Sequence, residues 1–193
     1  MRMVNWVDIE DQLFNLLNTD YYRKNSGINS PRDYARKSVI RAQGTALSAY
    51  STEVTVLELQ HPARSDRPVR LVRGFDSTHS GSEFGAWWID YNLFERFRHA
   101  TSTLPPALRE EKIKAFMRAR SAVSHDWSNM AGIAQLQLPL GSRSPALVGK
   151  AHYQRLVTDP KHHEYVPNVF LMGGDLQFYV CVRDPGWIRP IAA

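Results

Sequence analysis

The first fifty residues carry apolar positions at helical spacing. Within residues 6–17 these positions form one stripe, with acidic residues near its N-terminal end, and the pattern predicts a helix. The stripe consists of Trp6, Ile9, Leu13, Leu16 and Leu17. After a polar stretch, Ser30 can cap a second helix and Pro31 suits its first turn, so a helix is expected to about Ser48.

The pattern changes after Tyr50, where β-branched and apolar residues predict strands over residues 52–59 and 69–73. Two more helices should follow the strands. Asp90 can cap the first, and Pro105-Pro106 opens the second. Both helices are expected to pack on the sheet.

The last third of the chain alternates apolar and polar residues over 134–140 and 176–182, which predicts half-buried antiparallel strands. Gly173-Gly174-Asp175 predicts a turn that joins residues 165–172 to the final strand as a hairpin. The expected fold is α+β, with N-terminal helices packed on a mainly antiparallel, split sheet. No repeat or linker interrupts the chain, so residues 1–193 are expected to form a single domain, with a helical lobe over 1–50 and a core over 51–193.

The composition indicates where in the cell the protein is expected and what charge its partner should carry. Of 193 residues, 43% are hydrophobic, which is enough apolar surface to support a folded core. Cys181 is the only cysteine, so neither an internal disulfide nor a Cys-rich zinc site can form, and a cytoplasmic location is expected. Acidic residues follow the N-terminus closely, so a secretory signal is not expected there. No apolar run is long enough for a membrane span. The net charge of +5 favours a phosphate-bearing partner.

Arg73 is the first candidate for chemistry. Strand alternation places it on the face shared by Val69 and Leu71, so its guanidinium should point inward at the end of a strand. A buried arginine needs an anion. An internal carboxylate would make it structural, and a ligand pyrophosphate would make it functional. The strand alone favours the structural interpretation.

Trp87 and Trp88 follow a glycine-containing segment and precede the helix expected at Asp90. Both indoles can belong to the core, because tryptophan is a large apolar side chain. Alternatively, one of them enters the core and the other faces a flat ligand ring.

The segment 161–168 brings His162 and His163 next to Glu164. Adjacent residues on a strand point to opposite faces, so a shared metal is disfavoured. His162 with His152 or His125 can instead supply the acid and base of a metal-independent endoribonuclease. A solvated loop end is equally compatible with this segment. A non-enzymatic nucleic-acid-binding module is a third hypothesis, carried by the basic residues of the helix after Pro106.

Taken in chain order, three segments resemble the scattered signature of the ADP-ribosyltransferase superfamily, which includes bacterial toxins. Residues 71–74 resemble the first-strand Arg-Gly motif, residues 85–90 look like the second motif, and residues 162–167 are similar to the third. The resemblance implies NAD as substrate, with Arg73 and Gly74 holding its phosphates. It also implies that Trp87 or Trp88 lies at the nicotinamide.

By the same resemblance, Glu164 is the catalytic glutamate and His162 orients the acceptor. The Ser-Thr-Ser of many members is replaced by Trp87-Trp88-Ile89, and His162 stands where Glu or Gln is common. The presence of His162 at that position disfavours arginine as the acceptor and leaves a nucleic acid or another protein side chain. A toxin or effector of this kind implies an antitoxin or immunity protein as a partner and no membrane.

Overall fold

The computed structural model describes residues 4–25, 30–46, 54–64, 68–121, 123, 128–159, 164–180, 182 and 184–192. Its helices are α1 (Trp6–Leu17), α2 (Asp20–Asn25), α3 (Pro31–Ala46), α4 (Tyr91–Ala100) and α5 (Pro106–Ser121). Its strands are β1 (Thr55–Gln60), β2 (Arg70–Phe75), β3 (Trp87–Asp90), β4 (Gly132–Gln137), β5 (Arg143–Lys150), β6 (Gln154–Asp159), β7 (Glu164–Leu171), β8 (Leu176–Val180) and β9 (Ile188–Ile191). Short 3-10 turns, η1 (Ser82–Phe84) and η2 (Pro185–Trp187), precede β3 and β9.

Seven strands form one antiparallel sheet in the order β1-β5-β8-β3-β2-β4-β9, and β6 pairs with β7 in a separate two-stranded sheet. The α+β prediction is confirmed. One face of the large sheet buries a cluster to which all seven strands contribute, and we call it the inner cluster. Its members are Leu59, Leu71, Trp88, Ala134, Leu136, Leu138, Ala146, Val148, Phe178, Val180 and Ile188.

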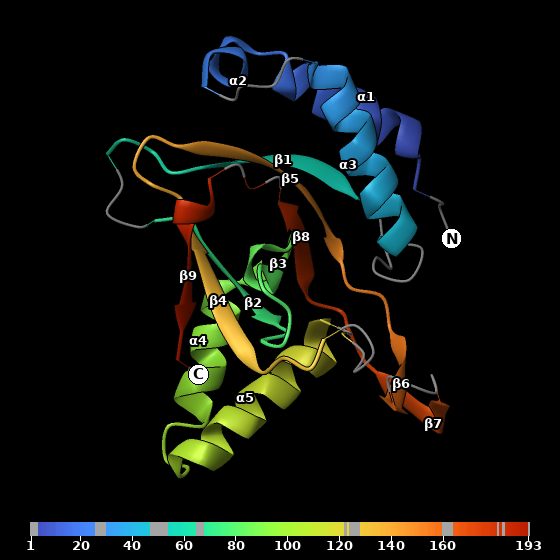
Figure 1. Ribbon diagram of the computed structural model, residues 1–193, viewed down its shortest axis with the longest axis vertical. Helices are drawn as coiled ribbons and strands as arrows, with labels where there is room; N and C mark the ends of the chain where they lie inside the picture. Colours follow the sequence, from blue (N-terminus) through green and yellow to red (C-terminus); the bar gives the residue numbers. More distant parts are fainter. Residues whose placement is uncertain are drawn as a thin grey trace.

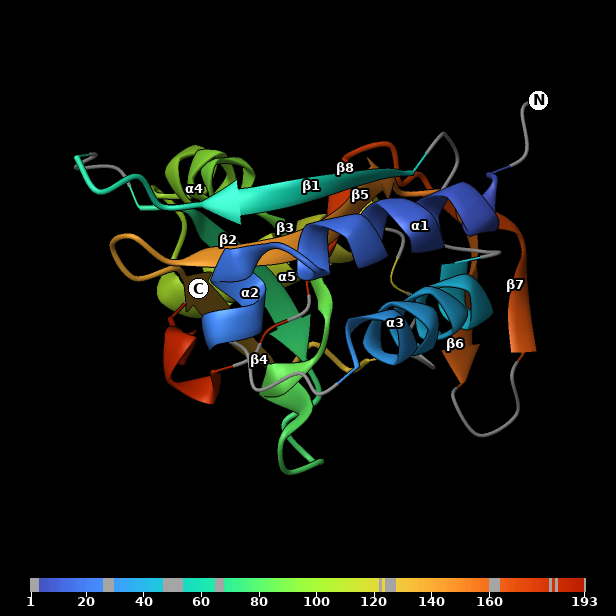
Figure 2. The same ribbon diagram turned by 90° about the horizontal axis from the view of Figure 1, so that it is seen from above.

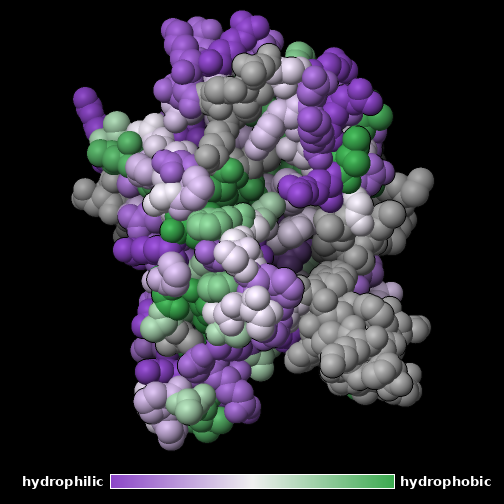
Figure 3. Space-filling view, in the orientation of Figure 1, coloured by the Kyte–Doolittle hydropathy of each residue, from purple (hydrophilic) through white to green (hydrophobic). Residues whose placement is uncertain are grey.

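Two groups of helices cover the opposite face of the sheet (Figures 1 and 2). Helices α1 and α3 pack near β1, β5 and β8, where Leu13 and Val39 join a core with Leu147. Helices α4 and α5 pack beside β2, β3 and β4 in a second core that contains Phe94 and Ile113. Hydrophilic residues cover the N-terminal helices at the top of Figure 3. No described helix is long and apolar enough to cross a bilayer.

Several predicted helices are confirmed. Helix α1 has the predicted bounds, and α3 begins at Pro31, with Ser30 Oγ accepting a hydrogen bond from the Asp33 amide at 3.4 Å. Asp90 caps α4, since its Oδ1 accepts from the Asn92 amide at 2.7 Å. These ends were predictable because capping depends on residues close in the sequence.

The predicted hairpin across Gly173-Gly174-Asp175 is wrong, because β7 pairs with β6 whereas β8 pairs with β3 and β5. Gly173 and Gly174 do adopt positive φ values of 62° and 88°, but their amides donate to Ala119 and Ala151. The two glycines therefore carry the chain from the small sheet into the large one.

Candidate functional site

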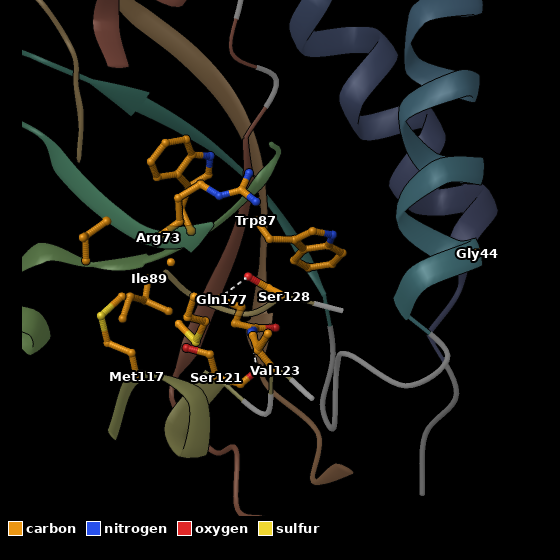
Figure 4. Close-up of a pocket in the computed structure, with 13 residues that line it drawn as sticks. Gly44, Arg73, Trp87, Ile89, Met117, Ser121, Val123, Ser128 and Gln177 are labelled. Carbon is orange, nitrogen blue, oxygen red and sulfur yellow. Dashed lines mark hydrogen bonds between the residues drawn. The ribbon is translucent and has the colours of Figure 1, made fainter. Parts of the chain in front are cut away.

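A cavity of about 370 Å³ opens where β2, β3 and β8 meet α5, with α3 on the far side (Figure 4). Its volume is within the range of small-molecule sites. Val72 lies opposite Ile89, and Ile89 opposite Gln177, so these three residues form a row across the strands. The lining residues are Gly44, Val72, Arg73, Gly74, Trp87, Trp88, Ile89, Met117, Ser121, Val123, Ser128, Met130 and Gln177.

Arg73 supplies the positive charge of the cavity wall, and its Nε and Nη1 are buried without a hydrogen-bond partner among the described residues. Burial lowers the pKa of Arg73 to about 10, and the negative charge of Glu83 partly opposes this shift. Arg73 is therefore still charged at neutral pH. Glu83 does not form a salt bridge with it among the described ion pairs. Among the described residues, Glu83 therefore acts on Arg73 through its charge and makes no direct ion-pair contact with it.

The two tryptophans occupy different environments. Trp88 is 1% exposed and belongs to the inner cluster, and its ring centroid lies 5.6 Å from the Arg73 Cζ. Trp87 is half-buried and meets the Tyr179 ring edge to face at 5.2 Å. In Figure 4, Trp87 lies beside the Arg73 guanidinium at the side of the cavity that faces α3. Of the two indoles, Trp87 is the one positioned to contact a ligand ring.

Gly74 makes room for Met130. A Cβ at Gly74 would lie 2.2 Å from the Met130 Cε, so a side chain there would force the end of the Met130 side chain to shift. Met130 itself has a positive φ of 50°, which costs energy for a non-glycine residue. Its amide donates to Ser128 Oγ at 3.0 Å, and this bond helps to hold the unfavourable conformation.

Gly85 packs directly against the Arg73 guanidinium, and a Cβ at this position would stand 1.5 Å from Nη1. We expect Gly85→Ala to push the guanidinium or the turn before β3 out of place. If the cavity binds an anion through Arg73, affinity should fall about tenfold or more, as measured by calorimetric titration with NAD.

Gly44→Ala is the matched control for Gly85→Ala, since its Cβ would meet nothing within 4 Å on the opposite wall. Adding a methyl group inside α3 should stabilise the helix slightly, and its ligand affinity reports the effect of an added methyl group that does not contact Arg73. Equal affinities for wild type and Gly85→Ala would contradict the tight contact with Arg73.

Gln177 and Ser121 were not among the predicted site residues. Gln177 is only 6% exposed and donates from Nε2 to the Ser121 carbonyl oxygen at 2.6 Å, which ties β8 to the end of α5. The alternation of 176–182 assigned Gln177 to a solvent face. Both faces of β8 are buried instead, because helices cover one of them. The sequence feature that could have indicated a buried Gln177 is its position between the apolar strand residues Leu176 and Phe178.

The third predicted motif, residues 162–167, lies largely outside the described part of the molecule. Glu164 begins β7 in the small sheet, and that strand is not a neighbour of β2 or β3. The side chain of Glu164 lies outside the described part of the molecule, as do His162, His163 and His125. His152 is described, and its Nδ1 lies 2.8 Å from the Tyr153 carbonyl oxygen. The roles of Glu164 and His162 stay predictions.

Most basic side chains of α5 have structural partners. Lys114 contacts Glu110 and the Ala131 carbonyl oxygen, and Arg120 binds Asp175 through two hydrogen bonds of 2.7 Å. Arg118 is buried and donates to the carbonyl oxygens of Val123 and Ser128. These contacts favour a structural use of the helix over a phosphate-binding face.

No family model, curated protein or solved structure matches the chain. Among the described residues, no group of three or more His, Cys, Asp or Glu side chains could hold a metal ion.

Proposed function

We propose that this protein is an NAD-dependent ADP-ribosyltransferase whose NAD site is the cavity beside β2 and β3. The observation that carries the proposal is the charged guanidinium of Arg73, buried in the cavity wall without a hydrogen-bond partner for Nε or Nη1 among the described residues. A pyrophosphate supplies both the charge and the acceptors that this group lacks. Trp87 offers an aromatic surface in the same cavity, which suits the nicotinamide ring.

The arrangement of the first two motifs gives further support. Arg73 and Gly74 lie on β2, and Trp87 and Trp88 lie on β3, its direct neighbour in the sheet. All four residues line the cavity. An ADP-ribosyltransferase-like core, with NAD bound at residues 51–193, is therefore part of the proposal.

In the proposed reaction, the bond between C1′ of the ribose and the nicotinamide nitrogen breaks, and its electron pair stays with nicotinamide. The acceptor forms a new bond to C1′ and loses a proton to the solvent. A carboxylate stabilises the positive charge that develops at the sugar ring. We assign this role to Glu164 and the orientation of the acceptor to His162.

The proposed acceptor is a nucleic acid or a protein side chain, in keeping with the net charge of +5. We propose a toxin or effector that acts in the cytoplasm and is neutralised by an antitoxin or immunity protein.

NAD should raise the melting temperature of the protein, because a ligand that binds only the folded state stabilises it by about 2.7 kcal/mol at a hundredfold excess over Kd. Arg73→Lys should reduce this stabilisation, since a lysine cannot reproduce the two-pronged hydrogen bonding of a guanidinium. Thermal unfolding with millimolar NAD, for wild type and variant, measures both effects. The absence of any shift in the wild type would argue against the NAD site.

An activity assay of the purified protein distinguishes the transferase from the endoribonuclease and the nucleic-acid-binding module. Incubation with cellular RNA and protein plus labelled NAD should transfer the label to one of them without cutting RNA. RNA cleavage that needs no NAD and disappears in His162→Ala or His152→Ala would favour the endoribonuclease. Salt-sensitive nucleic-acid binding with neither activity would favour the binding module.

A further inference from the structure

Trp88 carries a hydrogen-bond donor that the fold leaves unused. Its indole Nε1 is buried and has no acceptor among the described residues, although the side chain is 1% exposed. An indole N–H can only donate, and buried donors normally find a partner. The inner cluster around Trp88 is built from aliphatic and aromatic side chains such as Leu71, Ala134 and Phe178.

This unused donor lies beside the two unused donors of Arg73. The Arg73 Cζ is 5.6 Å from the Trp88 ring centroid, and the two residues belong to neighbouring strands. Together they provide three buried N–H groups and one positive charge at the cavity wall. Three buried donors and a charge on neighbouring strands match an acceptor that has several oxygens and a negative charge.

We propose that Trp88 is a second anion-binding residue, and that its indole N–H and the Arg73 guanidinium donate together to one phosphate group of the ligand. The inference rests on the proposed function in one respect, namely that the bound phosphate is part of the pyrophosphate of NAD. A phosphate fits better than a carboxylate, because its oxygens point in several directions and can reach donors that come from two strands. Trp88 therefore holds the ligand by its edge, whereas Trp87 offers a ring face.

The turn before β3 packs against the Arg73 donors. Gly85 packs on the guanidinium, and the 3-10 turn Ser82–Phe84 precedes it. Ser82 Oγ donates to the Asp76 carbonyl oxygen, and the Asp76 carboxylate accepts from Thr78 and Asn129. Nε and Nη1 of Arg73 are buried in this arrangement, so we expect the turn or the guanidinium to shift when a phosphate binds.

The test follows the indole N–H signals of ¹⁵N-labelled protein during titration with inorganic pyrophosphate. The signal that is missing from the Trp88→Phe spectrum should move downfield in the wild type, because hydrogen bonding to an anion deshields the proton. Trp88→Phe keeps an aromatic ring and removes the donor, so its pyrophosphate affinity should fall about tenfold. Trp187→Phe is the matched control, since Trp187 packs against the same inner cluster without lining the cavity.

Assignment by Trp→Phe variants at the other four tryptophans keeps the titration informative if Trp88→Phe does not fold. A Trp88 signal that stays in place at saturating pyrophosphate would overturn the proposal, as would an unchanged affinity in folded Trp88→Phe. If the Trp88 signal moves with pyrophosphate but NAD neither binds nor reacts, the phosphate site stands and the proposed function fails. If NAD is turned over while the Trp88 signal does not respond, the proposed function stands and this inference fails.

Discussion

Replacement of Arg73 by methionine is expected to abolish NAD binding and, at the same time, to make the ligand-free protein more stable. Arg73 brings a charge and two unpartnered N–H groups into the cavity wall. Each buried donor without a partner costs about 1–3 kcal/mol. The contact of its guanidinium with the Trp88 ring returns about 0.5–2 kcal/mol, which does not offset two such donors.

Methionine fills a similar volume without a charge or a donor. We expect the free energy of unfolding to rise by about 1 kcal/mol, or the Tm by roughly 2–4 °C for a protein of this size. Urea and thermal unfolding without ligand measure the gain, and titration with NAD measures the loss of binding. A variant less stable than the wild type would show that Arg73 has a structural partner.

The stability gap between Arg73→Met and wild type should depend on pH in one direction. The pKa of Arg73 is lowered to about 10 by burial, so the folded state releases this proton more readily than the unfolded state does. The cost of the buried charge is thus fully present at neutral pH and decreases as the pH rises through 10. The gap should be constant from pH 6 to 9 and should narrow above that range.

The second large effect concerns Glu164. Glu164→Gln should lower the rate of label transfer from NAD by about a hundredfold or more, because a neutral amide stabilises the developing positive charge poorly. NAD-induced stabilisation should largely survive, since the pyrophosphate is assigned to Arg73. Expression in bacteria gives a second measurement, in which wild type arrests growth and the variant does not.

Asp159→Asn is the matched control for Glu164→Gln, because Asp159 is the cross-strand partner of Glu164 in the small sheet. It removes one negative charge at the same end of the sheet and should leave the transfer rate unchanged. Full transfer by folded Glu164→Gln protein would assign the catalytic carboxylate to another residue.

The inward position of Arg73 could be predicted from the sequence, but the residues around it in the cavity could not. Inward alternation indicated that the Arg73 side chain is held in the interior, whereas the adjacent Trp87-Trp88 left open whether both indoles or only one enter the core. The assignment of the buried indole to Trp88 needed the structure, because it depends on which face of β3 meets the inner cluster. The contact of Gly85 with Arg73 also joins residues whose proximity no local pattern encodes.

What the sequence determined by itself is local. The stripe of α1, the caps Ser30 and Asp90, and the α+β class depend on side chains a few residues apart, which interact in the same way whatever the rest of the chain does. The tertiary structure decided the pairing of β8 with β3 and β5, which brings Gln177 to the cavity. Strand pairing depends on burial over the whole sheet, so a favourable glycine turn between β7 and β8 did not determine which strands became neighbours.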